Sequence, residues 1–220
     1  MDLNIQKVFS KSRLFEDINP FDYQEIIACL NGQTKTFDEH EFIFDCDENI
    51  DRMGIILEGS VDFNVIKSDG NINLIRRLYP SDSMGEVFAC SGMQLKSFEY
   101  VCVQKTKVMF LDIPRACTDK IHCNHTKKYK VMENMLKVVA EDNIFLNKKM
   151  FILSQRKLRD KLLSYIYLFK AKDSKEIWIP FNRQELADFI SADRSAVSRE
   201  LNKMKKERIV EIDSNSIKLL

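Results

Sequence analysis

Residues 182–206 read NRQELADFISADRSAVSRELNKMKK, and this stretch decides the architecture of the C-terminal third of the chain. Asn182 is followed three residues later by Glu185, a capping-box pattern that predicts a helix starting at residue 183. Residues 190–193 read ISAD and predict a short turn. A second helix is then expected from about residue 194. Its apolar positions fall on one face and its Ser and Arg residues on the other. Together these signals predict a helix-turn-helix.

The flanking sequence extends this unit on both sides. Residues 157–166 have the apolar spacing of a helix, and residues 177–180 (IWIP) read as a short strand. Beyond the second helix, residues 209–212 and 216–219 alternate apolar and polar positions around a turn at 213–215. The order helix, strand, helix, turn, helix, hairpin predicts a winged helix-turn-helix.

The exposed face of the second helix has the residue types that read DNA. In a helix-turn-helix the second helix enters the major groove, and Arg can make two hydrogen bonds to a guanine edge. Residues 155–220 hold 15 Lys/Arg against 10 Asp/Glu, whereas the first 154 residues hold 19 against 23. This basic balance fits a double-stranded DNA partner, although a solvated basic face is the alternative. The candidate DNA-binding residues on this helix are Arg194, Ser195, Ser198, Arg199 and Lys203.

A long helix is predicted immediately before this domain, over residues 126–154. Apolar residues follow each other there in steps of four and three, which is a heptad seam. A second stripe, Val131, Met135, Val138 and Phe145, lies beside it. We expect one stripe to pack on the protein's own domain and the seam to face a second copy in a homodimer. The alternative is an amphipathic helix that lies wholly on its own domain. The seam consists of Met132, Leu136, Val139, Asn143, Leu146, Met150 and Leu153.

The first part of the chain predicts a different architecture. After a short helical stretch, residues 33–113 carry short apolar runs separated by turn signals every eight to twelve residues. Asp69-Gly70 is a hairpin turn signal because Gly accepts positive φ. Even spacing of short strands predicts a β-roll or jelly roll. The expected organisation is a sensory β-roll domain over residues 1–125, a dimerisation helix over 126–154 and the winged helix-turn-helix over 155–220.

With these elements in place, the chain resembles the cyclic-AMP receptor protein/FNR (Crp/Fnr) family of transcriptional regulators. The resemblance covers nearly all of the sequence from about Phe15. It implies an α+β fold: an N-terminal double-stranded β-helix (a cupin-like jelly roll of the cyclic-nucleotide-binding type), a long dimerisation helix and a winged helix-turn-helix. It also implies a bacterial-type homodimer that binds an inverted-repeat operator and contacts RNA polymerase. The segments that carry it are 54–61 (GIILEGSV), 84–88 (MGEVF), 183–187 (RQELA) and 196–201 (AVSREL).

The resemblance also assigns roles in DNA recognition. Arg199 stands at the place of the family's guanine-reading arginine, and Arg194 resembles the other base-reading arginine of the cyclic-AMP receptor protein. Arg183 and Gln184 stand where family members contact the DNA backbone. Ser195 stands where the family often has a glutamate that reads cytosine. For this reason neither of the family's well-known DNA half-sites is expected to be the recognition sequence of this chain in unchanged form.

For the sensory domain, the resemblance points to an effector site. Gly85 and Glu86 match the pair that holds the ribose in cyclic-nucleotide-binding members. Lys96 and Ser97 stand where those members bind the cyclic phosphate with an Arg-Ser pair. Lys cannot make the bidentate hydrogen bonds that Arg makes to a phosphate. The bulky Phe98 also follows Ser97, where cyclic-nucleotide-binding members have a small residue. We therefore expect an unidentified small-molecule effector here and do not expect cyclic AMP, with a cyclic-nucleotide-responsive regulator as an alternative.

Thiol or metal chemistry is the alternative mode of sensing. The soft and borderline ligands in Cys-x4-His-Cys-x-His lie between the β-roll and the long helix, where a bound zinc ion or haem would act on the dimer. The spacing is not a standard zinc spacing, and packed or capping residues are the alternative that we favour. No cysteine precedes Cys29, so the N-terminal iron–sulfur cluster of FNR is not expected. The group consists of Cys117, His122, Cys123 and His125.

Several function classes are excluded by what the sequence lacks. It holds three His residues, with no G-x-S-x-G, Walker or H-E-x-x-H motif, so no enzyme is predicted. Its apolar runs are far shorter than the ~20 residues that span a bilayer. The first residues show neither a basic start nor an apolar core of a secretory signal. The expectation is a cytoplasmic regulator with no membrane partner.

Overall fold

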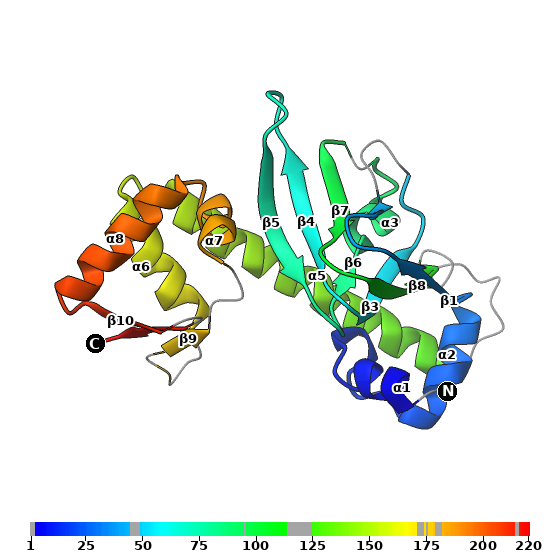
Figure 1. Cartoon of the computed structure of the whole chain (residues 1–220). Coiled ribbons are helices and arrows are strands. Elements are labelled where there is room, and N and C mark those ends of the chain that lie inside the picture. The colour runs from blue at the N-terminus through cyan, green and yellow to red at the C-terminus, as the bar shows by residue number, and fades with distance from the viewer. Residues whose placement is uncertain are drawn as a thin grey trace. The chain divides into compact units, whose positions relative to one another are not determined.

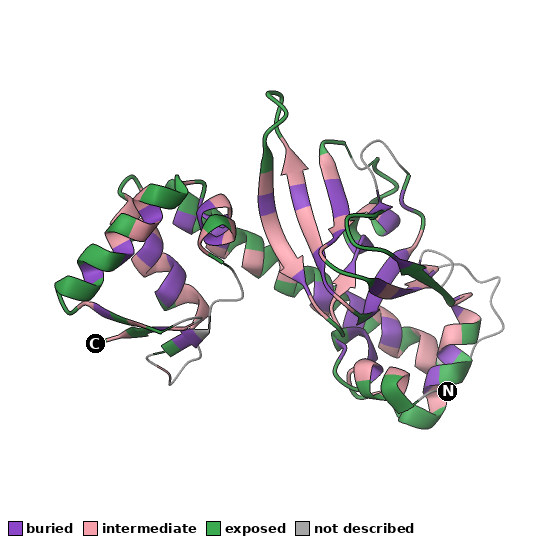
Figure 2. Cartoon of the chain, viewed as in Figure 1, coloured by how far each residue is buried: buried purple, intermediate pink, exposed green. Residues whose placement is uncertain are grey.

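The computed structural model describes residues 3–44, 49–94, 96–113, 125–170, 174, 176–178, 182–213 and 216–220. They form two compact units, Met1–Asp142 and Asn143–Leu220, and the division falls within one long helix. Each unit has its own core (Figure 2).

The first unit begins with short helices that bring three aromatic rings together. These elements are α1 (Leu3–Phe9), the 3-10 turns η1 (Arg13–Phe15) and η2 (Pro20–Asp22), and α2 (Tyr23–Cys29). The ring centroids of Phe9 and Phe15 lie 4.5 Å apart, and those of Phe15 and Tyr23 lie 5.1 Å apart. All three rings are buried in a cluster that also contains Val131 and Met135 of the long helix. The N-terminal helices therefore help to hold the long helix on this unit.

Two four-stranded antiparallel sheets form the β-roll, which confirms the predicted fold (Figure 1). One sheet has the order β1-β8-β3-β6 and the other β2-β7-β4-β5, with a second apolar cluster drawn from both sheets. The short helix α3 (Glu86–Ser91) follows β6. The strands are β1 (Gln33–Phe37), β2 (Phe42–Phe44), β3 (Met53–Glu58), β4 (Val61–Ile66), β5 (Ile72–Leu78), β6 (Ser83–Met84), β7 (Phe98–Cys102) and β8 (Thr106–Leu111).

The hairpin between β4 and β5 turns where the sequence predicts it. Gly70 has φ +81°, and Asp69 Oδ1 accepts a hydrogen bond from the Asn71 amide at 3.0 Å. Strand β1 does not stand out in the sequence, because four of its five residues are exposed and polar. Its backbone pairs with β8 along its whole length, and this pairing makes it a strand.

The long helix α5 runs from His125 to Ser154. Val131, Met135 and Val138 are buried, with at most 7% of each residue exposed. By contrast, Leu136 is 73% exposed and Met150 64% exposed. The second stripe of the sequence analysis thus packs within the chain, while the heptad seam does not.

The second unit has the predicted order of a winged helix-turn-helix. After α5 come α6 (Leu158–Phe169), β9 (Glu176–Trp178), α7 (Arg183–Phe189), α8 (Arg194–Lys206), β10 (Val210–Asp213) and β11 (Ser216–Leu219). The three strands form one antiparallel sheet with the order β10-β11-β9. Ile177 of β9 pairs with Ile217 of β11, and both are buried.

Candidate DNA-binding surface and effector site

The first helix of the helix-turn-helix starts with the predicted capping box. Asn182 Oδ1 accepts hydrogen bonds from the amides of Gln184 and Glu185 at 2.9 and 3.0 Å. In return, Glu185 Oε2 accepts from the Asn182 amide at 2.8 Å. This fixes the start of α7, and with it Arg183 and Gln184, in one backbone geometry. Arg183 is half-buried, which lowers its pKa, and Gln184 is exposed and donates to Asp188 at 2.9 Å.

A tight turn and an Asp cap set the start of α8. Ser191 in the turn has φ +51°, and Ala187, beneath the helix crossing, is fully buried. Asp193 Oδ1 accepts hydrogen bonds from the Ala196 amide at 3.0 Å and from Ser195 Oγ at 2.5 Å. These two bonds lower the pKa of Asp193, which therefore stays ionised at the positive end of the helix dipole.

One face of α8 is apolar and the other is basic. Val197, Leu201 and Met204 are buried, with at most 1% of each exposed. The Arg199 guanidinium donates to Ser195 Oγ at 3.4 Å across one helical turn. The structure places the sequence-predicted residues of α8 together on this helix: Arg194, Ser195, Arg199 and Lys203 are exposed, and Ser198 is half-buried.

The heptad seam of α5 remains an exposed apolar stripe on the single chain. Five of its aliphatic side chains are at least 36% exposed, and Met132 is half-buried. Asn143 is also exposed and accepts a hydrogen bond from Asn147 at 2.7 Å. Contiguous apolar patches of this kind are rare on the surfaces of monomeric proteins. The five exposed residues are Leu136, Val139, Leu146, Met150 and Leu153.

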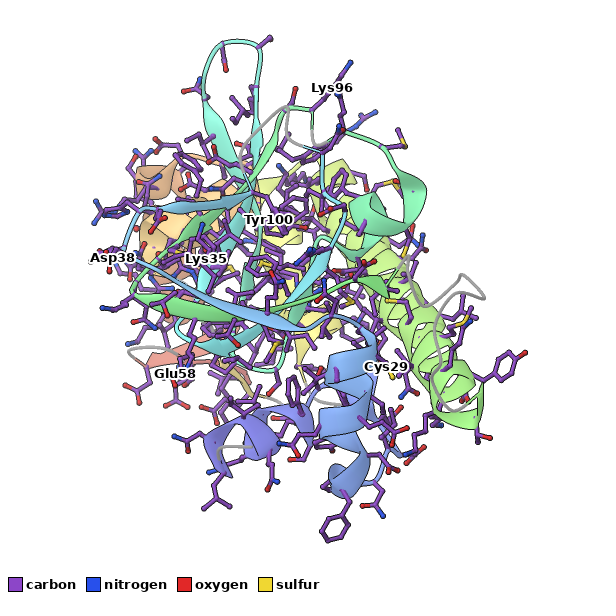
Figure 3. All side chains as sticks on the ribbon, turned by 90° about the vertical axis from the view of Figure 1, so that its right-hand side faces the viewer. Cys29, Lys35, Asp38, Glu58, Lys96 and Tyr100 are labelled. Atoms are coloured by element: carbon purple, nitrogen blue, oxygen red, sulfur yellow. The ribbon has the colours of Figure 1, made fainter. Side chains whose placement is uncertain are left out.

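The four residues predicted for the effector site have unequal surroundings. Gly85 has φ +76°, and a Cβ there would lie 3.0 Å from the Phe44 ring, so any larger residue would be strained. Glu86 is 5% exposed. Lys96 and Ser97 are exposed, and Figure 3 shows the Lys96 side chain directed outward while Tyr100 lies within the roll. The interior part of the predicted site therefore consists of Gly85 and Glu86.

Glu86 has neighbours that the sequence analysis did not single out. Its carboxyl group forms a side-chain hydrogen bond with Asp142 of α5, and Asp142 makes an ion pair with Arg76 of β5. Glu86 Oε2 is buried and has no hydrogen-bond partner, and a protonated Glu86 carboxyl group can donate to the Asp142 carboxylate. Burial and the Asp142 carboxylate raise the pKa of Glu86 well above its usual range.

The other groups around this carboxyl pair are Tyr100 and Asp82. Tyr100 Oη accepts a hydrogen bond from the Gly85 amide at 3.3 Å, and burial beside Glu86 raises its pKa. Burial likewise raises the pKa of Asp82, which accepts from the Tyr79 amide at 2.8 Å. Arg77, the next residue of β5, pairs with Asp62 at 2.7 Å, and because adjacent strand residues point to opposite faces, Arg76 faces the other way.

The thiol and imidazole group lies largely outside the described residues. This holds for Cys117, His122 and Cys123, and for the side chain of His125, where α5 begins. Among the described residues no group of three His, Cys, Asp or Glu side chains could hold a metal ion. Nor does any described helix have the length and apolar character needed to cross a bilayer.

Comparison with known proteins agrees with this architecture. Residues 156–220 match the Crp-like helix-turn-helix domain family. A search of curated proteins gives no match. Among solved structures, a CooA mutant from Carboxydothermus hydrogenoformans is similar, with a TM-score of 0.70 at 15% identity over 100% of this chain and 92% of that one.

Two further regulators have the same fold. The c-di-GMP-responsive global regulator CLP of Xanthomonas campestris has a TM-score of 0.69 at 11% identity, over 91% of this chain and 99% of that one. A cysteine-to-serine variant of CprK in complex with OCPA has a TM-score of 0.65 at 16% identity, over 89% of this chain and 88% of that one. Residues 156–220 thus match the Crp-like helix-turn-helix domain family, on a chain with the fold of the solved Crp/Fnr regulators.

Proposed function

We propose that the protein is a homodimeric, sequence-specific DNA-binding transcriptional regulator. The observation that carries this proposal is α8, whose apolar face is buried while Arg194, Ser195 and Arg199 are exposed in its N-terminal half. That is the geometry with which a recognition helix enters the major groove. Arg199 and Arg194 would bind base edges, Ser195 and Ser198 would contact neighbouring bases, and Lys203 would bind phosphate.

The start of α7 supplies the contacts that position α8. Arg183 and Gln184 lie at its first two positions, where a basic side chain and an amide side chain can meet a phosphate. Such contacts carry no sequence information, but they set the register of the protein on the duplex.

Dimerisation would follow from the exposed seam of α5. Packing Leu136, Val139 and Leu146 against a second copy removes apolar surface from water. Each Å² buried in this way stabilises the dimer by about 25 cal/mol. A two-fold axis along α5 would present two copies of α8 to an inverted repeat, with half-sites about one helical turn apart.

The effector site would act through α5. Asp142 lies on this helix and binds both Glu86 and Arg76 of the β-roll. A small molecule that enters beside Glu86 must alter these contacts and with them the attachment of α5. Such a ligand changes DNA affinity only as far as it binds one arrangement of the dimer better than the other.

Selection of bound DNA from a random pool tests the proposal. We expect a single inverted-repeat motif, and binding that weakens steeply as salt concentration rises. Recovery of no sequence motif from the purified full-length chain would contradict sequence-specific recognition. A motif without two-fold symmetry would contradict the dimer.

A further inference from the structure

We propose that Arg159 of α6 is the residue that fixes α8 in the orientation used to read DNA. The inference rests on the DNA-binding function proposed above. Arg159 itself is a positioning residue that acts through two carboxylates of the α8 segment.

The contacts of Arg159 use both ends of its guanidinium group. Its Nε donates to Glu200 Oε1 at 2.6 Å. Its Nη1 and Nη2 donate to the two oxygens of Glu207 at 2.6 and 3.2 Å. Glu200 lies within α8 and Glu207 directly follows its last residue, seven positions or about two helical turns further on, so both carboxylates lie on one side of the helix. One planar group therefore holds this side at two points.

Two points of attachment matter because the remaining packing has no fixed direction. The buried face of α8, formed by Val197, Leu201 and Met204, contributes apolar contacts, which are not directional. A guanidinium bound to carboxylates has a defined geometry. Arg199 directly follows Ser198 and precedes Glu200, so the rotation of α8 that Glu200 sets also sets the direction of Arg199.

A second cation on α6 holds the other end of the recognition helix. Lys161 Nζ donates to the carbonyl oxygen of Ile190 at 3.0 Å and of Ser191 at 3.4 Å, in the turn before α8. The turn is thus held by Lys161 and the end of α8 by Arg159. Both anchors belong to one helix, so α6 is the frame against which α8 is oriented.

Arg159 also compensates charge beside the DNA-binding surface. Its hydrogen bonds lower the pKa of Glu207, which keeps this carboxyl ionised and paired. Without Arg159, two carboxylates would stand uncompensated near a polyanion and would weaken binding to every sequence. A test must therefore separate this charge effect from positioning.

The test compares two variants with a matched control. Arg159→Met leaves both carboxylates uncompensated, whereas Arg159→Met combined with Glu200→Gln and Glu207→Gln removes all three charges. Arg156→Met is the control, because Arg156 is an exposed arginine just before α6. Binding is measured on the selected operator and on random-sequence DNA at one salt concentration. Circular dichroism confirms that each variant is folded.

Positioning by Arg159 predicts a loss of selectivity. The neutral triple variant should bind random DNA within about twofold of wild type and lose at least tenfold in its preference for the operator. Arg159→Met should bind both DNAs more weakly, and the control should keep its preference. A triple variant with an unchanged preference would show that Arg159 only compensates charge, and would overturn the proposal.

A measurement without DNA separates this proposal from the proposed function. Hydrogen exchange of the α8 amides in the free protein should be faster in the triple variant and in Arg159→Lys than in wild type, with Arg156→Met unchanged. Unchanged α8 exchange in both variants would refute positioning, even if the protein reads DNA. Faster exchange in a protein that selects no DNA sequence would leave the anchor in place and contradict only the DNA-binding function.

Discussion

Arg199 is the side chain on which the proposed base recognition by α8 would most depend. It is exposed one turn into the helix and rests against Ser195. If it binds a guanine edge, Arg199→Ala should cost about 1–3 kcal/mol and relax the preference at one base pair in each half-site. Lys205→Ala, in the last turn of α8, should instead weaken binding to all sequences and flatten the salt dependence. Measuring how both variants bind the operator and its single-base variants distinguishes a base-specific loss from a uniform one. Equal losses on every sequence would make Arg199 a phosphate contact.

Lys149 is a buried cation whose titration should be visible in stability. Only 8% of it is exposed, and its Nζ lies 4.2 Å from the centre of the Phe189 ring. Burial lowers the pKa of Lys149 to about 7. Between about pH 7 and 10.5 the unfolded chain therefore binds more protons than the folded chain. Stability should rise with pH across this window by up to about 1.4 kcal/mol for each pH unit.

Lys149→Met tests this assignment. The variant should be more stable than wild type at pH 7, and its stability should lack the increase with pH that comes from Lys149. Urea unfolding at several pH values measures both effects. The control is Lys148→Met, at a neighbouring half-buried lysine. A wild-type curve that runs parallel to that of Lys149→Met would show that Lys149 is not the titrating group.

At the scale of elements, α5 should decide the assembly state. Leu136 and Leu146 are 73% and 50% exposed on the single chain. If they lie in the dimer interface, Leu136→Lys combined with Leu146→Lys buries two unpaired charges there and should give a folded monomer. Sedimentation provides the measurement. The control is Tyr167→Lys, at an exposed residue of α6 that does not belong to the heptad seam. An unchanged dimer in the double variant would remove the seam from the interface.

The contact between α3 and α5 should depend on pH through Glu86. The pKa of Glu86 is raised in the folded protein, so the folded state holds a proton that the unfolded state releases. The stability due to this proton is complete below about pH 4.5 and is lost as pH rises through the folded pKa. Glu86→Gln keeps a donor for Asp142 at every pH. Urea unfolding from pH 4 to 8 should show wild type losing stability relative to the variant, and parallel curves would contradict a shared proton.

For the whole molecule, the arrangement of the effector site predicts no response to cyclic AMP. Lys96 is exposed, and the Glu86 carboxyl is already bound to Asp142. A ligand present at 100 times its dissociation constant stabilises a protein by about 2.7 kcal/mol. We expect no melting shift of that size with micromolar cyclic AMP. The control is the selected operator DNA, which should raise the melting temperature. A comparable shift with cyclic AMP would show that Lys96 serves as the phosphate ligand.

The sequence by itself determined the features that depend on near neighbours. The capping box of Asn182 and Glu185, the turn at Gly70 and the apolar spacing of α5 each involve residues a few positions apart, whose geometry is set by local backbone rules. These features were enough to predict the β-roll, the long helix and the winged helix-turn-helix. The pairing of the exposed, polar strand β1 with β8 was missed, because no local signal carries it.

Only the tertiary structure decided which charged groups meet. Arg76 and Asp142 are 66 residues apart, and Arg159 lies 41 and 48 residues from its two glutamates. A single sequence carries no signal for such pairs, since any arginine can serve any acidic residue that folding brings near. Burial likewise raised the pKa of Glu86 and lowered the pKa of Lys149, because desolvation depends on every element packed around a group. The candidate regulatory contacts of this protein are therefore a product of its packing.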